Sequence, residues 1–469
     1  MKRRDFISHT GAVLAGSFFV NPVQSIAQMQ DAGAKKRIAL VGTGIRGNTF
    51  WGRNLVEQYS DKVEFVGLCD INPGRLAFGK QFIGARCPTF TNFEEMMQRT
   101  KPDMLIVTTV DSTHDEFVVK GLEMGVDVIT EKPMTTDEEK CQRILDAEKK
   151  SGKKVIVGFN YRFNPHYTKI KELLSQARVG KITSVDFGWY LNTYHGASYF
   201  RRWHGLRDKS GTLLVHKASH HFDLLNWWLD SDPVEVYATG ALEHYGANHT
   251  AFRGDKCRTC PHKDKCRFYY DITKDEMNMK LYVAHEEHDG YIRDNCVWRP
   301  EIDIYDKMGV QIKYANNVQV NYSLTTYSPY EGMRIAFNGM DGRIDAWDGI
   351  PWRKEEKLSQ AELHAREMSQ GGEKENANYE EIIVADNFGD HELIKIPMTG
   401  AGHGGGDVRL QNKIFRNPEM EDPLKHSAGS RDGAMAILIG IAARKSIESG
   451  KPVKISDLTS IKPHIARMS

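Results

Sequence analysis

The chain has 469 residues, of which 40% are hydrophobic and 27% are charged, and its formal net charge is +1. A chain of this length exceeds what one ordinary hydrophobic core can fill, so we expect two soluble domains. The near-zero net charge gives no reason to expect nucleic acid or an acidic membrane surface as a partner.

The first 27 residues are typical of a targeting segment rather than of a folded element. Residues 2–7, KRRDFI, carry two arginines before an apolar pair, which is the twin-arginine pattern. An apolar stretch at residues 11–20 is too short for a permanent membrane span, and residues 25–27, SIA, suit a cleavage site. We therefore expect export of the folded protein to the periplasm, with a disordered basic N-terminus as the alternative.

A buried strand is expected at residues 38–41, followed at once by a G-x-G-x-x-G turn. Gly42 would allow the sharp turn, Gly44 would leave room for a pyrophosphate, and Gly47 would let the next helix approach the strand. A lone turn of this kind is weak evidence, but here it stands between a strand and a helical segment. The arrangement predicts nucleotide binding.

The residues after the turn extend this prediction to the rest of the nucleotide. Ile45 and Arg46 open the helix, whose free N–H groups would face the phosphates. A second strand at residues 65–69 ends in Asp70, which is in position to bind both ribose hydroxyls of the adenosine. An acidic residue there favours NAD over NADP, and Arg75 could stack on the adenine.

Apolar runs and helical segments continue to alternate as far as residue 158. The expected strands are at 102–109, 126–130 and 154–158, and the expected helices are at 92–100, up to 124, and at 136–151. A parallel, doubly wound α/β sheet explains this alternation most economically. We assign residues 35–158 to a Rossmann-type NAD-binding domain.

Glu131-Lys132-Pro133, Thr109-x-x-x-x-His114 and the run GFNYRF at residues 158–163 follow the glycine turn. With that turn, they resemble the glucose–fructose oxidoreductase/inositol dehydrogenase/MocA family, and the leader suggests exported members similar to glycoside 3-dehydrogenases. The resemblance implies a second α/β domain with a large, mostly antiparallel sheet covering the nicotinamide, and it implies that Lys132 lies beside the substrate hydroxyl. It also implies cofactor contacts from Thr109, Asp111, His114, Glu131, Asn160 and Arg162.

The second half of the chain agrees with that sheet. Strand-like runs occur at residues 182–190, 234–239, 310–315, 318–325, 333–338, 343–347 and 381–385, and several alternate apolar and polar residues. We assign 159–425 to a substrate and oligomerisation domain with an insertion at about 245–300, and 426–469 to a C-terminal helix and tail. The charged stretch 361–378 is expected to be a surface excursion, and an open sheet face favours a homo-oligomer.

The family resemblance also implies a segment of the form D-x-G-x-H-x-x-D beside Lys132. Here it reads HKASHHFD at residues 216–223, so His216 replaces the usual Asp and Ala218 the usual Gly. A histidine cannot supply a fixed negative charge to Lys132. Because His216 and His220 are four residues apart, one helix would place both on the same face.

Three interpretations of this histidine pair remain open. It could be catalytic or substrate-binding, it could bind a metal together with a carboxylate or His403, or it could be structural. Oxidation of an alcohol needs a group that takes the hydroxyl proton. We therefore expect Lys132 and His220 to handle that proton, with His216 as their partner.

Two further features are expected at the substrate. Residues 400–407, GAGHGGGD, are too glycine-rich for a strand or helix, so we expect either a lid over the sugar that carries His403 or a flexible linker. Aromatic residues could stack on sugar rings, although such residues more often pack in a core. Tyr161 and Trp203 are the candidates we favour, and Tyr190, Tyr194 and Trp227 are others.

Four of the seven cysteines lie within one basic insertion, at Cys257, Cys260, Cys266 and Cys296. This spacing suits a four-thiolate structural site, most simply for zinc, although an iron–sulfur cluster uses the same ligands. Two disulfides or free thiols are the alternatives. We expect a structural metal that ties down the insertion, because we expect the insertion to lack a core of its own.

Together these patterns predict an exported oxidoreductase that holds NAD tightly and oxidises a ring hydroxyl of a sugar or glycoside, at C3, to a ketone. The main alternative is an NAD-dependent glycosidase that oxidises its sugar transiently, eliminates the aglycone, adds water and reduces the sugar again. A sugar-binding protein with an inert nucleotide is a third possibility. It would leave Lys132 and His220 without a role.

Overall fold

The computed structural model describes residues 34–349, 359–360, 362, 375–399 and 402–467. The chain from Lys36 onward forms one compact unit, and both sheets belong to it. The predicted signal at residues 1–27 and most of the charged stretch at 361–378 lie outside the described residues. No helix in the described ranges is both long enough and apolar enough to cross a lipid bilayer.

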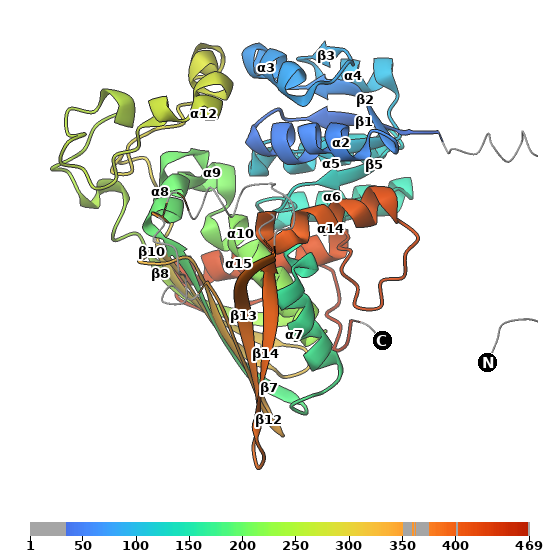
Figure 1. The fold of residues 1–469 in the computed structure, drawn as a ribbon, viewed down its shortest axis with the longest axis vertical. Coiled ribbons are helices and arrows are strands. Elements are labelled where there is room, and N and C mark those ends of the chain that lie inside the picture. Colours follow the sequence, from blue (N-terminus) through green and yellow to red (C-terminus); the bar gives the residue numbers. More distant parts are fainter. Residues whose placement is uncertain (1–33, 350–358, 361, 363–374, 400–401, 468–469) are drawn as a thin grey trace, which may run out of the picture. The chain divides into compact units, whose positions relative to one another are not determined.

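The first sheet has six parallel strands in the described part of the chain, in the order β3-β2-β1-β4-β5-β6. The strands are β1 (Lys36–Val41), β2 (Val63–Cys69), β3 (Thr89–Phe90), β4 (Met104–Val107), β5 (Asp127–Thr130) and β6 (Val155–Val157). They alternate with α2 (Asn54–Tyr59), α3 (Pro73–Ile83), α4 (Phe93–Thr100), α5 (His114–Glu123) and α6 (Glu138–Ser151). This confirms the predicted doubly wound sheet (Figure 1).

The turn after β1 has a backbone geometry that requires glycine at two positions. Gly42 has φ +94°, and a Cβ there would lie 2.6 Å from the carbonyl carbon of Thr108. A Cβ on Gly47 would lie 2.1 Å from the Gly42 oxygen, so only glycine lets the helix approach this closely. The helical segment was expected, but its first part, η1 (Gly47–Arg53), is a π-helix that leads into α2.

The second sheet has nine strands among the described residues, in the order β14-β13-β12-β11-β7-β10-β9-β8-β15. They are β7 (Ile182–Asn192), β8 (Pro233–Ala241), β9 (Lys307–Tyr314), β10 (Gln319–Ser328), β11 (Gly332–Gly339), β12 (Gly342–Asp348), β13 (Glu375–Asp386), β14 (His391–Thr399) and β15 (Val453–Lys454). Within the described part of this sheet, only β7 and β10 pair in parallel. The large, mostly antiparallel sheet is thereby confirmed, and β14 and β15 are additions to the predicted strands.

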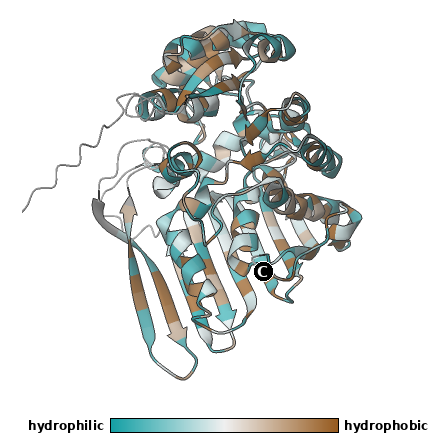
Figure 2. Cartoon of the chain, turned by 90° about the vertical axis from the view of Figure 1, so that its right-hand side faces the viewer, coloured by the Kyte–Doolittle hydropathy of each residue, from teal (hydrophilic) through white to brown (hydrophobic). Residues whose placement is uncertain are grey.

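Helices cover one face of this sheet. The C-terminal helix α15 (Ser430–Ser449) packs on β8 and on α11 (Ala218–Leu229), and α7 (Pro165–Ser175) packs on α11 (Figure 1). Residues along β10 alternate between buried and more exposed, and Figure 2 shows the matching alternation of hydrophobic and hydrophilic residues along the strands. Every residue of α11 is buried, so this helix belongs to the core.

The insertion lies between β8 and β9. Residues 242–306, all of which the structure describes, form no strand, but they contain α12 (Glu276–Leu281) and several 3-10 turns. α12 and the turn η8 (Val283–His288) contact α3 of the first sheet. In Figure 1 this yellow-green region lies beside α3, at the carboxyl edge of the parallel strands.

Candidate active site

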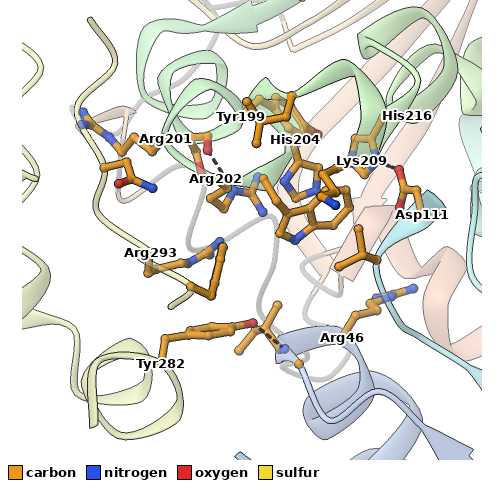
Figure 3. A pocket seen from close by; sticks show the side chains of 18 of the residues that line it. Arg46, Asp111, Tyr199, Arg201, Arg202, His204, Lys209, His216, Tyr282 and Arg293 are labelled. Atoms are coloured by element: carbon orange, nitrogen blue, oxygen red, sulfur yellow. Dashed lines mark hydrogen bonds and ion pairs between the residues drawn. The ribbon is translucent and has the colours of Figure 1, made fainter. Parts of the chain in front are cut away.

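One cavity of about 2250 Å³ brings the parallel strands, the helices of the second domain and the insertion together. Most of the predicted site residues line it, although they come from distant parts of the chain. These are Gly42, Gly44, Ile45, Arg46, Asp70, Arg75, Thr109, Asp111, His114, Glu131, Lys132, Asn160, Tyr161, Trp203, His216, His220 and His403. Figure 3 shows part of this cavity.

Arg162 is not among the residues that line the cavity, so its predicted cofactor contact stays without support. Its guanidinium donates to both carboxylate oxygens of Asp223, at 2.8 and 2.6 Å, and to Asp432 at 3.0 Å. Arg162 and Asp223 are each only 1% exposed. The residue therefore ties α11 to the start of α15, which is a structural role.

The nucleotide end of the cavity is built around Asp70. Its Oδ2 accepts the Thr43 N–H at 2.7 Å, which fixes the carboxylate against the glycine turn. Its Oδ1 accepts the Asn72 N–H at 2.9 Å, whereas the contact from Arg75 to Oδ1 is long, at 3.4 Å. Oδ1 therefore retains room for a ribose hydroxyl, and the cavity fits the adenosine half of NAD.

Arg75 does not stand free for an adenine, as the sequence suggested. Its Nη2 pairs with Asp289 of the insertion at 2.5 Å, and Asp289 lines the cavity as well. Two carboxylates, Asp70 and Asp289, thus surround the ribose position against one arginine. This charge balance disfavours a 2′-phosphate.

The insertion reaches the glycine turn itself. The hydroxyl of Tyr282 accepts the N–H of Ile45 at 2.9 Å, and Asn72 donates to the carbonyl of His285 at 2.9 Å. Gly44 faces the Tyr282 hydroxyl, which would lie 3.4 Å from a Cβ at that position. The backbone donor expected to meet phosphate is therefore covered by a residue more than 230 positions away in the sequence.

Lys132 belongs to the segment that follows β5, and its Nζ donates to the His216 carbonyl at 3.3 Å. Burial lowers the pKa of its ammonium to about 8, although Asp111 and Glu131 act to raise it. A lysine with this pKa can lose its proton near neutral pH. The Lys132-Pro133 peptide is cis.

His216 pairs with Asp111, which the sequence had assigned to the cofactor. The distance between His216 Nδ1 and Asp111 Oδ2 is 2.5 Å. Burial raises the pKa of Asp111 well above its usual value although Lys132 lowers it, and burial followed by the charge of Lys132 lowers the pKa of His216. Asp111 thus brings to this position the carboxyl group that the histidine lacks.

His220 stacks on Tyr161, with ring centroids 4.1 Å apart. Its Nδ1 has no hydrogen-bond partner among the described residues. Burial and, after it, Lys132 hold the pKa of His220 well below its usual value, so the imidazole is neutral. The helix expected to carry both histidines is interrupted at Lys217, between α10 (Leu213–His216) and α11, yet both rings still line the cavity.

The glycine-rich segment is not the loop that the sequence suggested. Residues 402–405 form a 3-10 turn in which His403 and Gly404 have positive φ, and the helix α14 (Gly406–Gln411) begins directly after it. His403 Nδ1 lies 3.0 Å from Asp407 Oδ2, and its ring lies 5.7 Å from the Tyr161 ring. The segment is thus folded against the cavity.

Asp407 connects this segment to the glycine turn. It accepts hydrogen bonds from Arg46 at 3.0 Å and from Asn160 at 2.6 Å, and Arg46 also pairs with Glu131 at 2.6 Å. Burial alone would raise the pKa of Asp407, but the charges of Arg46 and His403 hold it well below its usual range. Arg46 and Glu131 therefore form an ion pair with each other beside the position expected for the cofactor.

Thr109 and His114 are supporting residues at the cavity wall. His114 Nδ1 lies 2.8 Å from the carbonyl oxygen of Pro133, and Thr113 donates to the Thr109 hydroxyl at 2.9 Å. These contacts join the loop after β4 to the segment after β5. The joint position of Asp111 and Lys132 follows from this link.

The metal prediction for the four cysteines is not supported. All seven cysteines are free thiols, and the described residues, which include these four, hold no group of three or more His, Cys, Asp or Glu side chains placed for a metal. This also removes support for a metal on His216, His220 and His403. The four thiols do line one small cavity, and Arg201 donates to the Cys257 sulfur at 3.1 Å.

The reason for this outcome is that the insertion has a core after all. Trp298 is 5% exposed and packs against Phe268, while Tyr245 stacks on Phe200 at 4.1 Å. Packed aromatic side chains therefore stabilise the insertion, which is the role that the sequence analysis gave to a metal.

Several lining residues gave no signal in the sequence. Trp203 stacks on His204 at 3.6 Å, and the His204 ring lies 4.2 Å from that of His216. Arg202 and Arg293 also line the cavity. Of the other aromatic candidates, Tyr194 lines the cavity, whereas Tyr190 and Trp227 do not.

The two sheets and this cavity define an NAD-binding oxidoreductase, and the chain belongs to the Gfo/Idh/MocA oxidoreductase family. Residues 36–159 match the family's NAD-binding Rossmann fold, and residues 171–455 match its C-terminal alpha/beta domain.

The relatives are consistent with this assignment. Over 442 residues the chain is 36% identical to "Putative oxidoreductase YteT" of Bacillus subtilis (strain 168), covering 90% of this chain and 98% of that protein. It is 24% identical over 201 residues to inositol 2-dehydrogenase/D-chiro-inositol 3-dehydrogenase of Lactiplantibacillus plantarum, covering 43% of this chain and 54% of that protein.

Solved structures share the fold at low sequence identity. The aldose-aldose oxidoreductase from Caulobacter crescentus, complexed with glycerol, has a TM-score of 0.58 at 15% identity, over 90% of this chain and 100% of that one. An oxidoreductase from Thermotoga maritima has a TM-score of 0.61 at 16% identity, over 91% of this chain and 100% of that one.

Proposed function

We propose that the protein is an NAD-dependent dehydrogenase that oxidises a ring hydroxyl of a sugar or glycoside, at C3, to a ketone. The observation that carries the proposal is Lys132, whose pKa is lowered to about 8 in the cavity that also holds the glycine turn. The family membership and the inositol dehydrogenase relative support a polyhydroxylated substrate.

The residues divide the work as follows. Neutral Lys132 accepts the hydroxyl proton, and His220 orients the same hydroxyl or passes the proton on. Asp111 and His216 hold Lys132 in place through the backbone carbonyl and set its charge environment. Bound NAD would supply the hydride acceptor, with the glycine turn and Asp70 holding its adenosine half.

We further propose that the protein acts outside the cytoplasm with a cofactor that does not exchange, because residues 2–7 have the twin-arginine pattern. The insertion supports retention, since Tyr282, His285 and Asp289 all contact the nucleotide end of the cavity. A retained cofactor would be reoxidised in place by a second sugar or another acceptor.

The test uses glucosides and galactosides with a chromophoric aglycone. Reduced-nicotinamide absorbance and aglycone release are recorded in the same reaction with the purified, NAD-loaded protein. We expect one equivalent of reduced cofactor with the glycosidic bond intact, and mass spectrometry should place the ketone at C3. Steady aglycone release without net reduction would instead establish the redox-neutral glycosidase and overturn the proposal.

A further inference from the structure

Among the described residues, two arginines of the cavity, Arg202 and Arg293, lack the carboxylate partners that Arg46 and Arg75 have. Arg201 and Arg299 also lack them, but they donate to carbonyl groups or to the Cys257 sulfur instead. Arg46 pairs with Glu131 and Asp407, and Arg75 pairs with Asp70 and Asp289. In the described part of the chain, neither Arg202 nor Arg293 pairs with any carboxylate. Two positive charges therefore face the cavity without a negative partner.

The contacts that these two arginines do make are neutral. Arg202 donates from Nε to the Ser198 carbonyl at 2.8 Å, and its guanidinium lies 5.1 Å from the centre of the Tyr199 ring. Arg293 lies 5.2 Å from the centre of the Tyr282 ring. Aromatic faces and carbonyls orient the guanidinium groups but leave their charges uncompensated.

The two side chains extend toward each other from different segments. Arg202 directly follows α8 (Thr193–Arg201), whereas Arg293 belongs to the insertion (Figure 3). Burial and, after it, the charge of Arg293 lower the pKa of Arg202 to about 10. Holding two like charges together costs free energy, and an anion between them would offset it.

Three carboxylates of the cavity wall contact partners other than these two arginines. Asp111 is held by His216 at 2.5 Å, and Asp289 by Arg75 at 2.5 Å. Asp275 accepts from Asn278 at 2.6 Å. A bound anion could therefore supply the negative charge that completes the arginine pair.

The arginine pair is close to the reacting groups. Arg202 adjoins Trp203, whose ring lies 5.8 Å from the His216 ring, and its charge acts on both His216 and His204. A sugar placed with one hydroxyl at Lys132 would thus bring its other side toward Arg202. A carboxylate suits two guanidinium groups because its oxygens can accept paired N–H donors.

We infer that Arg202 and Arg293 bind an anionic group of the substrate, and that the sugar is an acidic one of the uronic acid class. This inference rests on the proposed function and specifies its substrate. A sugar phosphate is also anionic, so the experiment includes it as a separate substrate.

The experiment compares matched substrates on the NAD-loaded enzyme. The p-nitrophenyl glucoside and galactoside are each paired with the corresponding uronide, and a glucoside 6-phosphate is added. We expect kcat/KM for a uronide to exceed that of its neutral partner by ~10- to 100-fold, as for a hydrogen-bonded charge pair. Equal or better use of the neutral sugar would overturn the inference, and preference for the phosphate would overturn the uronic acid class.

Variants assign the preference to the arginine. Arg202→Met should reduce the ratio of uronide to neutral kcat/KM by about tenfold or more, and Arg202→Lys should restore part of it, because lysine keeps the charge but not the planar fork. Arg267→Met is the matched control, since Arg267 lines the same cavity but is exposed. An unchanged ratio in Arg202→Met would contradict the inference.

Two further measurements separate this inference from its alternatives. If Arg202→Met also loses its NAD, the anion at this site is the cofactor's pyrophosphate and the inference fails. If no substrate reduces NAD, the proposed function fails. Calorimetric binding of glucuronide and glucoside to the NAD-loaded protein and to Arg202→Met then still decides whether the anion site exists.

Discussion

At the scale of single residues, the account depends on the charge environment of Lys132. Burial lowers the pKa of this lysine to about 8, Asp111 and Glu131 act to raise it, and Lys217 and Arg46 act to lower it. The His216–Asp111 pair is thus more than a replacement for the family's usual aspartate. It brings a carboxylate from the first sheet to a lysine that faces the second domain.

The pH dependence follows from this environment. Because only neutral Lys132 can accept a proton, kcat/KM for oxidation should rise with pH, with a midpoint at about 8. Asp111→Asn removes a charge that raises this pKa and should move the midpoint to lower pH, whereas Lys217→Met should move it to higher pH, each on the order of one unit. A flat profile from pH 6 to 10, or shifts of the same sign, would contradict this role.

At the scale of elements, the insertion closes the nucleotide end of the cavity. Its residues contact the glycine turn and the start of α3, through Tyr282, His285 and Asp289. The ion pair between Arg75 and Asp289 is partly buried, at 11% and 16% side-chain exposure, so solvent screens it only weakly. We therefore propose that the insertion is a cover that slows the release of NAD.

Asp289→Asn should weaken this cover. Loss of a charge-assisted, partly buried contact costs about 1–3 kcal/mol, so NAD release should be ~5- to 100-fold faster. The rate can be measured by trapping released NAD with an excess of a dehydrogenase that consumes it. Lys280→Ala, which breaks an exposed ion pair with Glu276 on α12, is the control. Equal release rates in the two variants would refute the covering role.

The comparison of sequence and structure shows where local patterns suffice. Gly42 and Gly47 were assigned correctly because neighbouring atoms in and around the turn leave no room for a Cβ at either position. The strand β14 was not predicted, and its Pro397 is tolerated there because β14 is an edge strand. Patterns of short range thus predict elements well.

Contacts between residues that are far apart in the sequence could not be predicted from such local patterns. Arg162 was assigned to the cofactor by its motif, but Asp223 and Asp432 reach it from 61 and 270 positions away. The partners of Asp111 and Asp407 and the isolation of Arg202 likewise depend on how the two domains pack. Most of the site's members could be predicted, but their pairing could not.

At the scale of the whole molecule, one face of the nine-stranded sheet is left open by the helices. On this sheet Ile383 and Leu393 are paired across β13 and β14, and they are 39% and 46% exposed. Exposed apolar side chains that lie together on one sheet face can form part of a larger interface patch. We propose that a second copy of the chain covers this face, as the sequence led us to expect.

Leu393→Glu should break such an association. A charge placed in an apolar interface is left unpaired, so the molar mass measured by light scattering after gel filtration should fall from that of an oligomer to that of a monomer. Glu392→Lys, a neighbouring change on the same strand, is the control. A monomeric wild-type protein at micromolar concentration would contradict the proposal directly.

The most direct test of the central claim is a single-turnover measurement on Lys132→Met. The account predicts that this variant retains its NAD but reduces it ~100- to 10,000-fold more slowly with the best substrate, as for the loss of a general base. Lys209→Met, which removes an exposed lysine from the same cavity, should reduce NAD at the wild-type rate. Near wild-type reduction by Lys132→Met would show that another group accepts the proton, and the account would be wrong.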